Sequence, residues 1–598
     1  MSLEVIIMLC FLLFLITMFM FEPIKIDLIA LSIPVFLVVL NPWTQVSPSQ
    51  AISGFSSSAT VTIGAMFIIS SGVERSGLIQ ILGDKIISLT EQDETKQLLF
   101  IVIISGLIAG IINNTPVVAL FIPMVIGIAS QTNVSPSKFL IPLSYAAMMG
   151  GMLSLIGTSS NILASDILAR ELGRSYSMFE FTVVGLIVLA IGVIYLITIG
   201  RKLIPARLDP KGELTQEFEL VRYLSEVEIK ASSDLIDKTI NDFLAEIDYE
   251  VDIVRMTRDG EKFFEPLDNK SIQAGDRLIV KANHKNLITL TKDYNLKIVR
   301  RSNITQEQFE AESEDNKLVE IVIPHGSFVA GQTLEEVNFL QRYRSSILGI
   351  RHGEEITHNR LEDVELTVGD VLLLSTGDKT LDRLRENTNF IISNEIGTSD
   401  YRSDKIIPSL GILATVIILA TFNILPIVIA SLAGVIAMVI SGCLRANEIY
   451  EAINWDVIFL LSGLIPLGIA MENTGTAEFI AGQILSLEPF LSPLLILILF
   501  YLITAVFASL MGNAVSVILM MPIALNAASQ LGLNPFAFGL VVTFAASSGF
   551  LTPIGYQTNL MVYSPGGYKF YDFFIVGAPL QLILTFVVPT VISLLWGL

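Results

Sequence analysis

The sequence predicts a polytopic α-helical membrane protein, made of an inverted repeat of five spans plus a re-entrant hairpin each, with two small α+β domains inserted between the repeats. Three observations predict this fold. The 598 residues are 52% hydrophobic and only 16% charged, which is far more apolar than a soluble chain of this length. A polar block separates two apolar regions. These two regions also match each other along their length.

Apolar segments long enough to cross a bilayer lie on both sides of the polar block, five before it and five after it. They fall near 3–20, 25–41, 59–73, 138–156 and 181–200, and near 406–422, 424–442, 456–470, 537–553 and 574–597. The N-terminus has no basic region and no small-residue cleavage site before its apolar run, so the first segment is expected to remain as a helix.

Two further apolar stretches, 97–130 and 492–529, are interrupted at their middle by a polar tip. The tips read INNTP and MGNAV. Each half of a stretch is expected to be too short to cross the bilayer with its tip outside. A re-entrant hairpin is therefore predicted at both places.

The two apolar regions align at an almost constant offset. NNTPVVALFIP (113–123) matches GNAVSVILMMP (512–522), YAAMMGG (145–151) matches FAASSGF (544–550), and IGTSSN (156–161) matches IGYQTN (554–559). Earlier, VERSG (73–77) lies over MENTG (471–475). Because five spans separate equivalent points, the second copy is expected to enter the membrane upside down, as in the inverted-topology repeats of secondary transporters.

The distribution of Lys and Arg predicts the orientation. If the polar block is cytoplasmic, the predicted outer connections near 42–58, 472–491 and 530–536 contain neither residue, and only Arg170 and Arg174 break the pattern. The predicted inner connections hold Lys25, Arg75, Lys85, Lys96, Lys138, Arg201, Lys202, Arg402, Lys405, Arg445 and Lys569. We therefore expect a multi-pass protein of the plasma (inner) membrane with residues 206–400 in the cytoplasm. The first hairpin would then enter from the cytoplasm and the second from outside.

Uncharged polar residues interrupt each apolar region twice, at the hairpin tips 113–115 and 512–514 and at the breaks 157–161 and 555–559. Backbone that leaves a helix at membrane depth needs polar partners, and its carbonyls together with Asn and Ser/Thr oxygens suit a hard cation such as sodium. The positive helix N-termini that follow the breaks suit an anion. These segments contain no Lys or Arg, so cation coupling is expected to be obligatory. Any one such residue alone more often only joins neighbouring helices; the paired occurrence favours a site.

These motifs resemble those of the divalent anion/sodium symporter family, in which Ser-Asn-Thr marks each hairpin tip and Gly-x-x-x-Asn marks each broken helix. The resemblance covers both membrane halves. It implies one sodium site at the first tip and break, a second at the other pair, and an anion between the tips. The implied sodium ligands are Asn113, Asn114, Gly157, Asn161, Gly512, Asn513, Gly555 and Asn559. The implied anion contacts are Asn114, Thr115, Thr158, Ser159, Asn513, Ala514, Gln557 and Thr558.

The sequence departs from the family pattern at both tips and both breaks. The tips read Asn-Asn-Thr and Gly-Asn-Ala, and the breaks lack the double proline that is common among dicarboxylate carriers. The loss of hydroxyls at the second tip argues against a clamp for two carboxylates. It agrees with a compact tetrahedral dianion.

The polar block contains a duplication of its own. SEVEIKASSDLIDKTINDF (225–243) resembles VEIVIPHGSFVAGQTLEEVNF (319–339). Further along, each copy of the duplication ends with Gly-Asp before an apolar strand, in AGDRLIV (274–280) and VGDVLLL (368–374). Alternating strands, one short amphipathic helix and hairpin turns predict a small α+β fold used twice. The block resembles tandem TrkA-C domains, also called C-terminal regulator-of-conductance (RCK) domains, which pair and gate transporters or channels, in some cases by binding a nucleotide such as cyclic di-AMP. A folding or dimerisation module without a ligand is the alternative.

The predicted organisation has four regions. They are a first membrane repeat (1–205, hairpin 97–130), a first TrkA-C domain (206–300), a second TrkA-C domain (301–400) and a second membrane repeat (401–598, hairpin 492–529). The formal charge of −20 arises largely in the polar block, so it argues against nucleic-acid binding.

Together these patterns predict a homodimeric sodium-coupled symporter of a small divalent anion that works by alternating access and is not an enzyme. Sulfate is the first choice, because family members with these domains between the repeats resemble sulfate permeases of bacteria and algae. A di- or tricarboxylate symporter and a non-transporting anion sensor remain alternatives. A channel would need a filter of the Thr-Val-Gly-Tyr-Gly type, a primary pump a phosphate-binding loop, and an enzyme a catalytic constellation at membrane depth; the sequence contains none of these.

Overall fold

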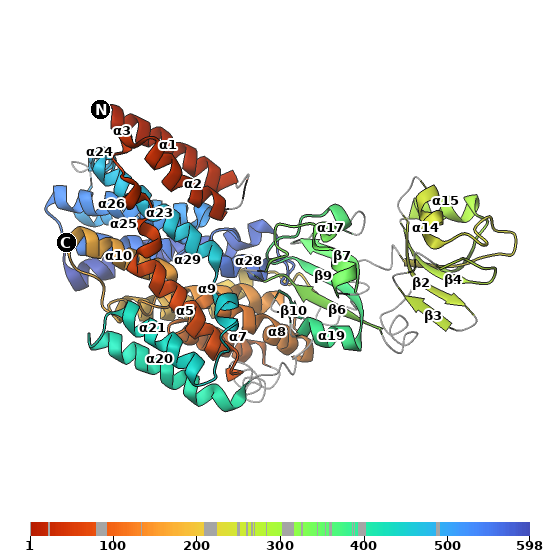
Figure 1. The fold of residues 1–598 in the computed structure, drawn as a ribbon. Helices are drawn as coiled ribbons and strands as arrows, with labels where there is room; N and C mark the ends of the chain where they lie inside the picture. Colours follow the sequence, from red (N-terminus) through yellow and green to blue (C-terminus); the bar gives the residue numbers. More distant parts are fainter. Residues whose placement is uncertain are drawn as a thin grey trace.

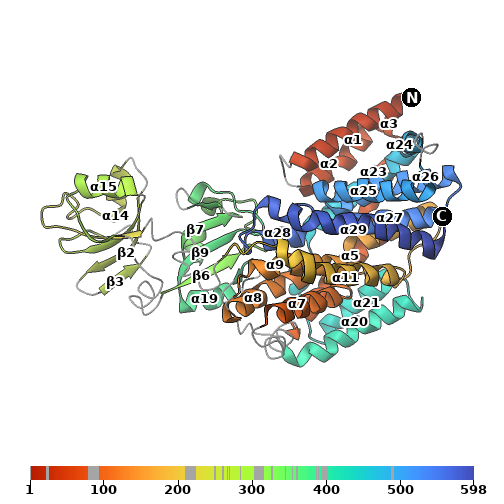
Figure 2. The same ribbon diagram turned by 180° about the vertical axis from the view of Figure 1, so that it is seen from behind.

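The computed structural model consists of a helical bundle and two small sheet modules that extend from one end of it (Figures 1 and 2). It describes residues 2–21, 24, 26–78, 93–132, 134–208, 224–247, 251–258, 261–264, 267, 270–282, 284–301, 316–324, 327–343, 345–352, 355–357, 361–385, 387, 389–392, 402–485 and 491–598. In both views the module that begins at residue 316 lies beside the bundle, and the module that begins at residue 224 lies beyond it.

The first half of the bundle consists of long helices, a helical hairpin and a broken helix. Asp93 caps the first hairpin arm, since its Oδ1 accepts from the amides of Thr95 (2.8 Å) and Lys96 (3.1 Å). The described elements are α1 (Leu3–Phe21), α2 (Ile26–Val39), α3 (Asn41–Thr44), α4 (Pro48–Ala51), η1 (Ser53–Ser56), α5 (Ser58–Glu74), α7 (Glu94–Ala109), α8 (Asn114–Thr132), α9 (Ser137–Gly151), α10 (Ser159–Leu172), α11 (Thr182–Tyr195), the π-turn η2 (Leu196–Gly200) and α12 (Arg201–Leu203).

The second half repeats this order of long helices, hairpin and broken helix. Ser492 and Asn534 cap its hairpin and its broken helix, each followed by a proline at the first helical position. The described elements are η5 (Ser403–Lys405), α20 (Ile406–Thr421), α21 (Ile427–Ile440), α22 (Glu448–Ala452), α23 (Trp455–Asn473), α24 (Thr476–Leu485), α25 (Pro493–Met511), α26 (Asn513–Leu531), α27 (Pro535–Ala546), α28 (Gln557–Tyr563) and α29 (Phe570–Trp596).

The polytopic helical character is confirmed. Within the described ranges, six helices are long and apolar enough to cross a membrane, namely Thr182–Leu203, Ser403–Thr421, Trp455–Asn473, Pro493–Met511, Asn513–Leu531 and Phe570–Trp596, and shorter apolar helices accompany them. The prediction that each half of the stretch 492–529 is too short to cross the bilayer is wrong, because α25 and α26 each have 19 residues and are long enough to cross. What sets α26 apart is burial: 78% of its apolar stretch is buried inside the protein, against 17% for Ser403–Thr421.

Two predicted spans end earlier than the sequence suggested. The span predicted at 138–156 is helical only to Gly151, and the one at 537–553 only to Ala546. At both places an asparagine side chain further along binds carbonyls that the break leaves without a helical amide, as described below. In the second, Pro553 could not have offered an amide to the carbonyl of Gly549 in any case.

The polar block folds into two modules with the same topology. The first has β1 (Leu224–Glu228), α14 (Ile240–Glu246), β2 (Asp252–Arg258), β3 (Glu261–Phe264), β4 (Arg277–Lys281), α15 (His284–Asp293) and β5 (Lys297–Arg301). The second has β6 (Asn316–Val322), α17 (Leu334–Val337), α18 (Phe339–Tyr343), β7 (Ser346–His352), β8 (Glu355–Thr357), η4 (Leu361–Asp363), β9 (Val371–Gly377), α19 (Asp378–Arg385) and β10 (Ile391–Ile392). The antiparallel sheets run β3-β2-β4-β1-β5 and β8-β7-β9-β6-β10, which is one order used twice.

Each module has more helices than the single amphipathic helix that was predicted, and α17 and α18 of the second module follow its first strand as α14 does in the first. The additional helices, α15 and α19, are mostly polar and each places a pair of leucines in its module's core, Leu287 with Leu290 and Leu381 with Leu384. So few apolar positions give a weak periodic signal. The opposite faces of the two sheets share a buried cluster that includes Val254, Ile279, Leu318, Val322, Leu348, Val371 and Leu373, so the modules pack on each other.

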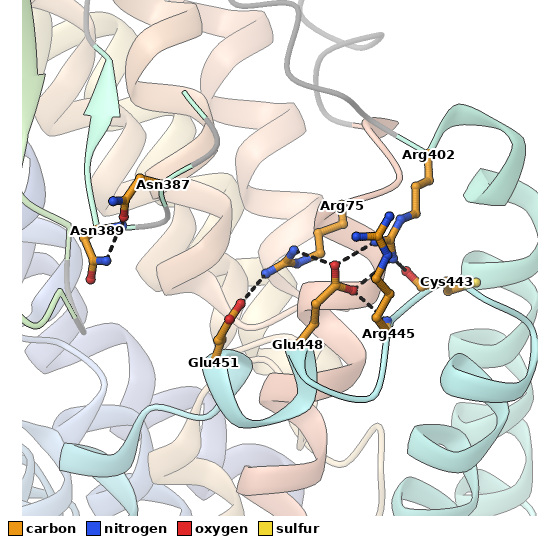
Figure 3. A network of polar contacts seen from close by, with 8 residues as sticks. All are labelled: Arg75, Asn387, Asn389, Arg402, Cys443, Arg445, Glu448 and Glu451. Carbon is orange, nitrogen blue, oxygen red and sulfur yellow. Dashed lines mark hydrogen bonds and ion pairs between the residues drawn. The ribbon is translucent and has the colours of Figure 1, made fainter. Parts of the chain in front are cut away.

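A network of charges ties the exit from the soluble modules to both halves of the bundle (Figure 3). Arg402 donates to both carboxylate oxygens of Glu448 (2.7 and 3.0 Å) and to the carbonyl of Cys443 (2.8 Å). Arg75, which follows α5, donates to Glu448 (3.0 Å) and to Glu451 (3.3 Å). Burial alone would raise the pKa of Glu448, but these donors and a backbone amide lower it below its ordinary value.

We expect Glu448→Gln to lower the free energy of unfolding by about 1.5–3 kcal/mol, because charge-assisted bonds to two guanidinium groups are lost at a side chain that is only 6% exposed. Thermal unfolding in detergent measures the change. The exposed Glu451→Gln is the matched control and should cost at most about 1 kcal/mol. Equal effects of the two substitutions would contradict the assignment.

The same measurement has a defined pH dependence. The lowered folded pKa makes the contribution of Glu448 fully present above the ordinary value of 4.5, and the contribution is lost as the pH falls from there through the folded value. The Gln variant should lack this acid-sensitive part of the stability.

Candidate functional site

The first broken helix is held open by the side-chain amide of Asn161. Its Nδ2 donates to the carbonyl of Gly151, where α9 ends (3.1 Å), and to that of Ser154 inside the break (2.9 Å). Asn161 itself is 1% exposed. One NH₂ group therefore satisfies two carbonyls that the break removes from the helical ladder.

The second broken helix uses the same device at the aligned positions. Asn559 donates to Gly549 (2.9 Å) and to Thr552 (3.1 Å). The residues just before α10 and α28, Thr158 and Tyr556, both have extended backbone, with φ of −144° and −150°. The extended backbone and the two bonds recur together, so the two breaks share one local structure.

Each hairpin tip is bonded to the break of its own half through a hydroxyl. Ser154 donates to the carbonyl of Gly110 at the end of α7 (2.6 Å), and Thr552 donates to that of Ser509 near the end of α25 (2.5 Å). Sequence reasoning missed both hydroxyls. They were visible in the alignment, since each lies three residues before the glycine of its break.

The two tips differ in how the chain turns. In the first, the Oδ1 of Asn113 accepts from the amide of Thr115 (3.2 Å). In the second, Gly512 has φ of +80°, a conformation that residues with a Cβ rarely adopt. Glycine at this position is therefore explained by the backbone.

The residues of the four segments converge on the hydroxyl of Tyr556. It accepts from Nδ2 of Asn114 and lies 3.0 Å from Oγ1 of Thr158. Asn513 of the second tip is a further hydrogen-bond partner. Beside it, Oγ1 of Thr115 donates to Oε1 of Gln557 (3.2 Å). Three predicted residues from both tips and the first break thus meet one phenol that was not predicted.

Tyr556 escaped prediction although its position was aligned. It lies over Thr158 in the matched segments IGTSSN and IGYQTN and is the only aromatic residue in either break. The signal was that the second break has a tyrosine, whose hydroxyl lies further from the backbone, where the first break has a threonine.

Backbone approaches closely at the glycines of both breaks. A Cβ on Gly157 would lie 2.6 Å from the carbonyl oxygen of Gly151 and 2.9 Å from that of Ala109. A Cβ on Gly555 would lie 3.0 Å from the carbonyl oxygen of Ser509. Any larger residue would displace the carbonyls, which are the hard oxygen groups that alkali cations prefer in transporter sites.

The remaining predicted residues border this centre. Oγ of Ser144 on α9 donates to Thr558 (2.9 Å) and to Oδ1 of Asn559 (2.7 Å), so both ends of the Asn559 amide are engaged by the protein. Ser159 is the half-buried first residue of α10, and Ala514 is a buried residue in the first turn of α26. In the described part of the chain, no three His, Cys, Asp or Glu residues gather as a metal-binding group.

We expect Asn559→Asp and Asn161→Asp each to destabilise the protein by about 1–3 kcal/mol, because a carboxylate oxygen would face two carbonyls in place of a donor. Asn526→Asp is the matched control, since that amide lies on α26, is half buried and donates to one carbonyl, Pro522 (2.9 Å). Thermal unfolding in detergent is the measurement. Equal melting temperatures for Asn559→Asp and Asn526→Asp would exclude the clamping role.

Comparison with known proteins agrees with this architecture. The family model described as citrate transporter matches residues 16–543 and 490–597. An uncharacterized transporter of Synechocystis is 42% identical over 589 residues, covering 98% of this chain and 96% of the relative. A putative sulfur deprivation response regulator of Chlamydomonas reinhardtii is 28% identical, covering 89% and 92%.

A third relative shares a shorter region. Sodium/sulfate cotransporter 1 of Chlamydomonas reinhardtii is 27% identical over 404 residues, which are 64% of this chain and 44% of the relative. The match of the family model across nearly the whole length confirms the resemblance found in the hairpin tips and the breaks. The chain belongs to the citrate transporter family of divalent anion/sodium symporters.

Proposed function

We propose that the protein is a sodium-coupled symporter of a small divalent anion, with sulfate as the first candidate. The observation that carries the proposal is the convergence of Asn114, Thr158 and Asn513 on the hydroxyl of Tyr556. In a centre made of amides, hydroxyls and carbonyls without a charged side chain, helix N-termini offset only part of the charge of a dianion, so cations are expected to enter with it.

The proposed sodium sites follow the two tip-and-break pairs. Asn113, Asn114 and Gly157 serve the first ion, and Gly512, Asn513 and Gly555 serve the second. Asn161 and Asn559 complete the two sets as framework residues, because their amide hydrogens bind the carbonyls of the breaks. This refines their predicted role as direct ligands.

The anion is proposed to lie between the tips. It would contact the predicted residues Asn114, Thr115, Thr158, Ser159, Asn513, Ala514, Gln557 and Thr558 and the newly found Tyr556. The engagement of Thr115 with Gln557 (3.2 Å) supports this placement, since it joins the first tip to the second break.

The architecture supports alternating access by an inverted repeat. Equal clamps at Asn161 and Asn559 and equal tip-to-break bonds at Ser154 and Thr552 are the local signs of two copies of one unit. The proposal places α7–α8 and α25–α26 as re-entrant hairpins from opposite sides of the plasma membrane. It places the two sheet modules in the cytoplasm as TrkA-C domains, and it makes the protein a homodimer.

The choice of substrate rests on the relatives and on the second tip. The relatives named sodium/sulfate cotransporters favour sulfate, and the hydroxyl-poor second tip suits a compact dianion. The description of the family model as citrate transporter keeps a di- or tricarboxylate as the alternative. The relative named a putative sulfur deprivation response regulator keeps a non-transporting sensor as a second function.

Purified protein in proteoliposomes should take up radiolabelled sulfate when sodium is outside, and replacement of sodium by potassium should abolish the uptake. Unlabelled sulfate should compete and citrate or succinate should not. Competition by carboxylates alone would favour the alternative substrate. Sodium-dependent sulfate binding without uptake would identify a sensor, and sulfate uptake that is independent of sodium would overturn the proposal.

The variants Asn114→Ala, Asn513→Ala and Tyr556→Phe should each raise the sodium concentration for half-maximal uptake by about tenfold or more, the effect of about 1.4 kcal/mol. Each removes a bond at the centre where the tips meet. The matched controls are Asn526→Ala and Tyr501→Phe, whose side chains bond to Pro522 and Ser548 instead. Wild-type sodium activation in all three site variants would remove the site hypothesis.

A further inference from the structure

The second sheet module touches the bundle through a tight turn, residues 367–370, which we call the contact turn. His352 of the module also lies against Tyr563 of α28, with ring centroids 6.4 Å apart, and β10 lies against α8. Gly369 in this turn has φ of +89°, and a Cβ there would lie 2.4 Å from the carbonyl oxygen of Leu560 on α28. The neighbouring Val368 packs against the hydrophobic core of the bundle. Figures 1 and 2 both show the second module beside α28.

The contact turn is stiffened from within its own module. The carboxylate of Asp370, 1% exposed, accepts from the amide (2.7 Å) and the hydroxyl (3.0 Å) of Thr367 and lies 2.6 Å from Nδ1 of His352. The amide of Gly369 donates to Ile323 at 2.8 Å. The turn therefore meets α28 as a preformed part of the sheet module.

The first module contains the same turn without the contact. Gly275 has φ of +90°, its amide donates to Ile229 at 2.8 Å, and Asp276 accepts from the amide of Gln273 at 2.8 Å. Among the described residues other than its two chain neighbours, none has a heavy atom within 4 Å of the place of a Cβ on Gly275. The turn thus belongs to the module fold, whereas its fit against the bundle is particular to the second copy.

The helix under the contact turn is part of the proposed transport site. Leu560 lies within one helical turn of Gln557, which binds Thr115 of the first tip (3.2 Å). Between them, Thr558 and Asn559 accept from Ser144 on α9. Because α28 runs only from Gln557 to Tyr563, a restraint at Leu560 acts on the residues that border the site.

We infer that the contact turn is the point at which the soluble modules act on transport, and that it restrains α28 while it is seated. This inference rests on the proposed function. Alternating access requires the elements around the site to move relative to their surroundings. A module seated on the backbone of α28 opposes that movement, and its release speeds transport.

The test is the comparison of Gly369→Ala with Gly275→Ala in the full-length protein. Both substitutions place alanine at a positive φ and share that local strain, but only Gly369→Ala collides with α28. We expect amide hydrogen exchange of residues 557–563 to become about tenfold faster in Gly369→Ala alone, equivalent to about 1.4 kcal/mol of lost restraint. Sulfate uptake should rise severalfold in the same variant.

A second pair of variants avoids the backbone strain. Val368→Glu places a charge in the contact with the bundle, whereas Ala274→Glu places it at the corresponding exposed position of the first module. We expect faster exchange in α28 and faster uptake for Val368→Glu and wild-type values for Ala274→Glu. Agreement between the two glycine variants, together with agreement between the two Glu variants, would overturn the inference.

Two other outcomes are also decisive. Faster exchange in α28 combined with slower uptake would overturn the restraint, because the contact would then support transport. Absence of sulfate uptake by the wild-type protein would count against the proposed function alone, and the exchange difference would still decide whether the contact turn holds α28.

Discussion

The membrane halves depend on the satisfaction of backbone carbonyls where two helices break. Lipid offers no hydrogen bonds at that depth, so open carbonyls need polar partners. In both halves one asparagine amide supplies two hydrogens to two carbonyls three residues apart. This arrangement fixes the extended residue inside each break, Thr158 or Tyr556, and directs its side chain toward the opposite half. Without the clamps, the residues that meet at the centre would have no fixed positions.

The frame is nearly symmetric, but its centre is not. The clamps and the tip-to-break bonds occur twice with the same partners, whereas the hydroxyl that joins Asn114, Thr158 and Asn513 comes from one side only. The tips also differ, since one turns through an asparagine side chain and the other through Gly512 at positive φ. A dianion bound as we propose would therefore meet unequal surroundings at the two tips, and its binding need not depend equally on the two proposed cation sites.

Sequence periodicity and internal alignment predicted the helical segments and the duplication in the polar block, and the family resemblance implied the pairing of tips with breaks. Composition alone did not predict where the helices end, because the carbonyls of the breaks that follow α9 and α27 are satisfied by asparagine side chains further along the chain. Tyr556 was missed for a similar reason, because its role depends on the contacts that its hydroxyl makes across the bundle with Asn114 and Thr158. The seat of Gly369 on Leu560 joins residues almost two hundred positions apart, and no local pattern marks it.

The charge network of Figure 3 has a consequence for biosynthesis. Arg75 is synthesised early, but its partner Glu448 follows only after the whole soluble block and two further helices. The nascent first half therefore emerges before Glu448 and Glu451, the carboxylates that Arg75 binds among the described residues, have been made, and Arg402 is the first described residue after the block to join the network. Closure of the network is a late event in assembly. Two separately expressed halves would each carry part of this junction and would have to find one another to complete it.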